Sequence, residues 1–249
     1  MADPRIINCY ALLPGGVNHL HEFAMRSLDE LIDHHDPRWP DVQAWIADAT
    51  NEVTVFPANE STRAKNLHAA QVTTRSPMGA LIYESGGLIV DRGWLRILGG
   101  GCNEFERSLP QWNHDCGTMT GASPPSFLLV ADDVAGGHFA INGGGLGDDI
   151  GNTYYFAPDS LSWDPLDIGY TDFLLWAFAG DLQSFYADFR WTNWQIEIAD
   201  LSPDRTISFY PFLSAAADSI DARHRGTVTA LEAFRLQLDM AQQLGGPLP

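Results

Sequence analysis

Apolar side chains recur at helical spacing in the first and last parts of the chain. The segment 42–49 has apolar residues at positions i, i+3, i+4 and i+7, which places them on one face of a helix. Two prolines in 36–40 interrupt this pattern, so one helix is expected over 17–35 and another over 41–50. The same reasoning predicts helices over 61–70, 170–179, 181–189 and 227–244.

The segment 76–87 begins and ends with residues typical of helix boundaries. Ser76 can accept a hydrogen bond from a free backbone amide as an N-cap, and Pro77 suits the first helical position. Gly86 can end such a helix in the left-handed conformation. Two strands around a turn are the alternative, because an apolar run alone does not distinguish a helix from a strand.

The middle of the chain consists of short apolar runs separated by turn residues, which is typical of antiparallel strands. Residues 132–136 have hairpin chemistry, and 99–125 are expected to form a loop interrupted at 109–112. Helices, then a meander of antiparallel strands, then helices predict one α+β domain over residues 1–249. The expected strands are 52–56, 88–98 (one strand, or a bulged pair around Gly93), 127–131, 137–141, 152–156 and 207–212.

The charge of the chain restricts its possible partners more than its overall composition does. Hydrophobic residues make up 45% of the chain, which is ordinary for a folded protein, but the formal net charge is −18. Such a surface repels phosphate backbones and anionic membranes, so it suits a basic protein partner or serves only solubility. Three cysteines without a paired spacing and the lack of a long apolar segment predict a cytoplasmic location.

The candidate chemistry is sparse. The glycine-rich segment 142–151 lacks the residues of a phosphate-binding loop and is interpreted as a tight connection between strands. Asp148 and Asp149 offer oxygen ligands without the spacing of a calcium loop, and the histidines do not have zinc-ligand spacing. His114 and Cys116 form the best candidate for nucleophilic catalysis, which requires a thiol of lowered pKa. We therefore expect no metal, no cofactor and no catalytic residue.

Exposed tryptophan beside arginine is a common composition of protein-binding surfaces. Trp94 with Arg96, and Trp112, are therefore candidate partner-binding residues, together with the acidic Asp148 and Asp149. Tryptophan beside arginine is equally typical of a loop that is anchored in the protein interior. The sequence therefore leaves open whether these residues bind a partner or anchor a loop.

Several longer segments carry a resemblance to a known family. Residues 71–80, 91–99, 127–134, 139–144 and 154–159 resemble the bacterial domain-of-unknown-function family 2625, over about 28–212, with extensions at both ends. The order of parts also resembles the SUKH superfamily, many of whose bacterial members are immunity proteins that neutralise toxins. The first resemblance implies no catalytic residue, and the second implies a SUKH-like α+β fold.

These observations favour a non-enzymatic protein-binding module, of which an immunity protein against a basic toxin is one form. An enzyme with a site near the glycine-rich segment or His114 and Cys116 is one alternative. A structural protein that forms homo-oligomers is the other. Binding to nucleic acid or to a membrane is not expected.

Overall fold

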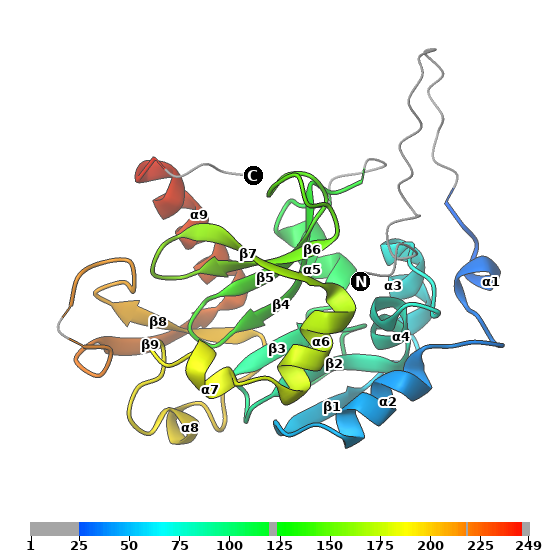
Figure 1. Cartoon of the computed structure of the whole chain (residues 1–249), viewed down its shortest axis with the longest axis horizontal. Coiled ribbons are helices and arrows are strands. Elements are labelled where there is room, and N and C mark those ends of the chain that lie inside the picture. The colour runs from blue at the N-terminus through cyan, green and yellow to red at the C-terminus, as the bar shows by residue number, and fades with distance from the viewer. Residues whose placement is uncertain (1–24, 120–123, 218, 246–249) are drawn as a thin grey trace, which may run out of the picture.

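The computed structural model describes residues 25–119, 124–217 and 219–245 and contains a seven-stranded antiparallel sheet (Figure 1). Each strand pairs with the next one along the chain, so the expected meander and the α+β class are confirmed. Strands β8 (Arg205–Tyr210) and β9 (His224–Thr229) form a separate pair. The sheet comprises β1 (Val53–Pro57), β2 (Ser85–Val90), β3 (Leu95–Leu98), β4 (Phe127–Asp133), β5 (His138–Asn142), β6 (Asn152–Ala157) and β7 (Ser162–Gly169).

Helices precede and follow the sheet, although the first is shorter than its pattern indicates. The part of the predicted helix 17–35 that precedes residue 25 lies outside the described residues. The rest forms one turn, because the Asp33 side chain accepts hydrogen bonds from the backbone amides of His35 and Asp36 and ends the helix. The helices are α1 (Leu28–Leu31), α2 (Trp39–Ala47), α3 (Arg63–Ala70), α4 (Pro77–Glu84), α5 (Leu109–Asp115), α6 (Tyr170–Ala179), α7 (Leu182–Phe185), α8 (Trp194–Glu197) and α9 (Ala230–Gln243).

Helices cover both faces of the sheet. Neighbouring side chains on β5 show this, because successive side chains of a strand point to opposite faces. His138 contacts Trp112 of α5 and Phe234 of α9, with ring centroids 6.4 and 4.7 Å away. The next residue, Phe139, contacts Phe173 of α6 at 4.9 Å. The sheet is therefore a middle layer between α5 and α9 on one side and α6 on the other, as Figure 1 shows.

Helix α4 begins as its sequence predicts. The Ser76 hydroxyl accepts a hydrogen bond from the Gly79 amide at 3.1 Å, and Pro77 is the first helical residue. The predicted left-handed end at Gly86 is wrong, because Ser85 is already extended and the chain continues directly into β2. The helix interpretation is confirmed, and the alternative of two strands around a turn is wrong.

Strands β2 and β3 form a regular hairpin. The single strand or bulged pair expected over residues 88–98 is not what the structure shows. Val90 pairs with Leu95, and the intervening turn closes through the Trp94 amide, which donates to the Asp91 carbonyl at 3.1 Å. Gly93 has φ of 102°, a conformation that glycine adopts without the steric cost of a side chain. The turn therefore needs Gly93 at this position.

The structure adds elements that the apolar pattern did not predict, namely α5, α8, β7 and β9. Helix α5 lies within the predicted loop 99–125, and its buried Asn113 exchanges two 2.8 Å hydrogen bonds with the backbone of Leu129 on β4. Strand β7 carries exposed Asp164, Pro165 and Asp167 and forms one edge of the sheet. The predicted helix 181–189 is reduced to the single turn α7, which the Asp181 side chain caps by accepting a hydrogen bond from the Ser184 amide.

Candidate functional site

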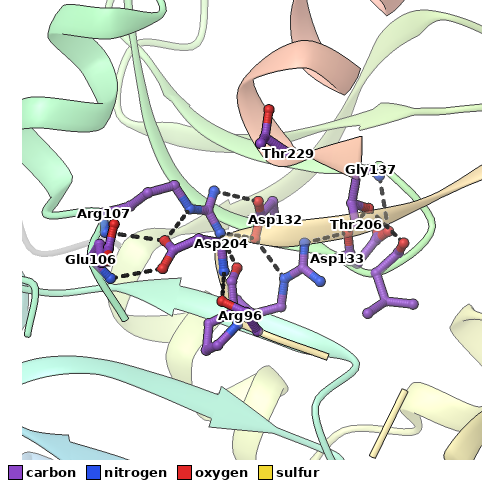
Figure 2. A network of polar contacts seen from close by, with 12 residues as sticks. Arg96, Glu106, Arg107, Asp132, Asp133, Gly137, Asp204, Thr206 and Thr229 are labelled. Atoms are coloured by element: carbon purple, nitrogen blue, oxygen red, sulfur yellow. Dashed lines mark hydrogen bonds and ion pairs between the residues drawn. The ribbon is translucent and has the colours of Figure 1, made fainter. Parts of the chain in front are cut away.

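Buried charges gather around Asp132, near the end of β4 (Figure 2). Its carboxylate accepts hydrogen bonds from Arg96 Nε on β3 at 2.9 Å and from Arg107 Nη1 at 2.6 Å. Arg107 Nε also donates to Asp204 Oδ1 at 3.1 Å, just before β8. The network therefore joins the large sheet to the β8–β9 pair.

The charges of this network balance one another. Arg96 and Asp132 are each only 1% exposed. Burial alone raises the pKa of Asp132, but the guanidinium groups of Arg107 and Arg96 outweigh it and hold that pKa well below its usual range. A carboxylate held so firmly in its charged form is a poor general base, so the geometry indicates a structural role.

Asp133, beside it, closes the turn between β4 and β5. Its carboxylate accepts hydrogen bonds from the amides of Ala135 and Gly137, both at 2.9 Å, and from the Tyr155 hydroxyl at 2.8 Å. Burial raises the pKa of Asp133. The hairpin expected at residues 132–136 is present between β4 and β5, but Asp132 and Asp133 themselves are the last residues of β4 and are buried.

His138 is a buried histidine next to this network. Burial lowers its pKa from 6.5 to about 4, so the imidazole is neutral in the folded protein at pH 7. Below pH 6.5 the unfolded chain binds a proton at this residue that the folded chain does not bind. Stability is therefore expected to fall by about 3 kcal/mol between pH 6.5 and pH 4 because of His138 alone.

A His138→Phe variant, which keeps an aromatic ring between Trp112 and Phe234, should lack this part of the pH dependence. Urea unfolding of both proteins at several pH values between 4 and 7 measures the difference. Equal pH slopes in the two proteins would contradict the assignment.

The structure places three of the five candidate partner-binding residues in the interior. Trp94 is fully buried, with its ring 4.9 Å from that of Trp194, and Arg96 belongs to the network of Asp132. Trp112 is 3% exposed and lies under the guanidinium of Arg107 at 4.5 Å. The structure therefore shows these three side chains as buried anchors, which is the second of the two interpretations that the sequence left open.

The glycine-rich segment forms a closed connection between β5 and β6. The side-chain oxygen Oδ1 of Asn142 accepts hydrogen bonds from the backbone amides of Gly144 and Leu146 at 2.7 and 3.0 Å. Asp149 accepts hydrogen bonds from Asn142, Asn152 and the Tyr154 hydroxyl. These side chains are committed to shaping the loop, which supports its interpretation as a structural connection.

His114 and Cys116 do not form an activated pair. The structure shows the His114 ring largely exposed and 3.3 Å from Asp115. Burial raises the pKa of the Cys116 thiol to about 12, the opposite of the shift that nucleophilic catalysis requires. The geometry therefore gives no support to a catalytic cysteine here.

Five aspartates lie on the edge strand β7 or on the connections before and after β6, and we call this group the anionic surface. The hydrogen bond to Asp149, burial, and the charges of Asp149, Asp167 and Asp148 raise the pKa of Tyr154 to about 12, so three of these carboxylates act on the same side chain. The chain has no Lys or Arg anywhere between residues 108 and 189. The anionic surface consists of Asp148, Asp149, Asp159, Asp164 and Asp167, none of which has an ion-pair partner among the described residues.

The sequence predicted Asp148 and Asp149 but missed the other three members of this surface. The long cation-free stretch was the signal that could have revealed them. Within the described part of the chain, no group of three or more His, Cys, Asp or Glu side chains is placed to hold a metal ion. None of the helices there has the length and apolar content needed to cross a membrane.

Comparison with known proteins identifies relatives along most of the chain. YbfG, an uncharacterised protein of Escherichia coli (strain K12), is 42% identical over 223 residues, which cover 88% of this chain and 98% of the relative. An uncharacterised protein of Haemophilus influenzae (strain ATCC 51907 / DSM 11121 / KW20 / Rd) is 39% identical over 205 residues, which cover 82% and 90%. The family model described as "Protein of unknown function DUF2625" matches residues 28–233. The chain therefore belongs to the DUF2625 family.

Proposed function

We propose that this chain is a protein-binding module whose anionic surface meets a basic partner. The observation that carries the proposal is that five aspartates on β7 and on the connections flanking β6 have no ion-pair partner among the described residues. The net charge of −18 adds a long-range attraction for any cationic protein. Complementary charge of this kind mainly accelerates encounter and makes binding sensitive to salt.

Neutralising the anionic surface is expected to weaken partner capture by about tenfold at low ionic strength. The variant is Asp159→Asn with Asp164→Asn and Asp167→Asn, which preserves side-chain size and suits the left-handed φ of 57° at Asp167. The measurement is affinity capture of the tagged full chain from its native host, with cross-linking mass spectrometry to locate the contact.

The matched control removes the same number of charges elsewhere. Asp29→Asn, Asp48→Asn and Glu60→Gln alter exposed residues that lie in or beside α1, α2 and α3. The proposal is supported if a captured partner cross-links to β7 and is captured by the control variant but not by the triple Asp→Asn variant. Equal capture by both variants, or no partner at all, contradicts it.

The finer form of the proposal is an immunity protein that neutralises a basic toxin. It is motivated by the resemblance to the SUKH superfamily together with the surplus of acidic residues. Co-expression with the product of a neighbouring toxin-like reading frame tests it. Rescue of growth by the unaltered chain, and loss of rescue with the triple Asp→Asn variant, is the expected result. Failure of the unaltered chain to rescue growth would remove the immunity role.

A further inference from the structure

A cleft of about 700 Å³ lies between α3, α5 and the connection that follows β3. Lys65 and Asn66 of α3 line one side, Asn103 and Glu106 come from the connection, and Gln111 comes from α5. This volume falls within the range of small-molecule sites, about 300–1,000 Å³. The cleft is separate from the anionic surface.

The carboxamides of this cleft have unused hydrogen-bonding capacity. Asn66 donates to the Gly100 carbonyl at 2.6 Å, and Gln111 donates to Asp115 at 2.8 Å, which leaves both side-chain carbonyl oxygens without a partner among the described residues. Asn103, an exposed residue, has no side-chain hydrogen bond within those residues. A ligand here meets amide donors and acceptors together, which matches the chemistry of a peptide main chain.

The cleft also carries two opposite charges without partners. Lys65 is the single lysine of the chain, and Glu106 stands on the connecting segment. Neither forms an ion pair within the described parts of the chain. A ligand with one positive and one negative end satisfies both of them.

A second cleft of similar size, about 710 Å³, shows the contrast. Its arginines already have partners, since Arg190 is paired with Asp91, and Arg92 lies 3.5 Å from Glu52. A charged ligand there must displace an existing ion pair. A groove beside α9 holds only about 90 Å³, too little for a ligand of several residues.

We infer that the cleft between α3 and α5 binds a short peptide with free termini. Its carboxylate faces Lys65, its ammonium group faces Glu106, and its amides bond to Asn66, Asn103 and Gln111. The inference does not depend on the anionic surface or on a basic partner.

Titration of the ¹⁵N-labelled full chain with tri-alanine, followed by NMR, tests this inference. Chemical-shift changes are expected at the backbone amides of the cleft residues. N-acetyl tri-alanine amide, which lacks both terminal charges, should bind at least about tenfold more weakly, because hydrogen bonds to charged groups contribute most. This comparison uses the unaltered protein and needs no variant to fold.

Two variants sharpen the test. Lys65→Met and Glu106→Gln should each weaken tri-alanine binding by about tenfold, whereas the control Arg92→Met in the second cleft should leave it unchanged. Absence of shifts at millimolar tri-alanine, equal binding of the blocked peptide, or shifts confined to residues outside the cleft would overturn the inference.

Discussion

Replacing Asp132 with asparagine is expected to lower the free energy of unfolding by about 3–5 kcal/mol. The neutral amide would leave Arg96, which is 1% exposed, without a compensating negative charge, and would leave Arg107 with Asp204 as its remaining ion-pair partner. Breaking a buried ion pair is costly because the remaining charge has lost its hydration and has gained no partner. Urea unfolding at pH 7, followed by tryptophan fluorescence, measures the loss.

Asp164→Asn on β7 is the control for this substitution. It makes the same chemical change at an exposed residue without an ion pair among the described residues, and its effect should stay within about 0.5 kcal/mol. A loss below about 1 kcal/mol for Asp132→Asn would show that the interior tolerates an uncompensated Arg96, and would contradict the assigned role of the network.

The second large effect is expected at Gly79, in the first turn of α4. Alanine is favoured over glycine in helices by about 1 kcal/mol, so propensity alone predicts a gain. A Cβ at this position would lie 2.1 Å from the Thr73 carbonyl oxygen and 2.5 Å from its carbon. Backbone atoms cannot move aside as a flexible side chain does, so Gly79→Ala should destabilise the protein by about 3 kcal/mol.

Gly226→Ala on β9 is the matched control, because no atom lies within 4 Å of its added Cβ. Removing the conformational freedom of glycine from the unfolded chain should make this variant neutral or more stable, by up to about 1 kcal/mol. Thermal unfolding of the two variants beside the unaltered protein measures both effects. Similar melting temperatures for the two would contradict the close contact at Gly79.

Elements with a local boundary signal could be predicted from the sequence. Ser76 and Asp181 cap their helices through their own side chains, and these contacts lie within three residues. Strands β4, β5 and β6 were predicted because apolar runs alternate with turn residues. Strands β7 and β9 escaped prediction because their sequences are polar and pairing with a neighbour defines them.

The buried network could not be predicted, because its members come from distant parts of the chain. Arg107, Asp132 and Asp204 meet only after the β8–β9 pair has packed against the large sheet. Trp94 and Arg96 gave the composition of a binding surface and form part of the core, since composition does not report which way a strand faces. The anionic surface was predictable in part, from Asp148 and Asp149.

The composition of β7 also limits how molecules of this protein can aggregate. A free sheet edge recruits another strand when its outward amides and carbonyls form an uninterrupted row. Pro165 has no amide hydrogen, and Asp164 and Asp167 would face the same charges on an identical neighbour. Both the missing donor and the like-charge repulsion therefore oppose fibril growth through this edge.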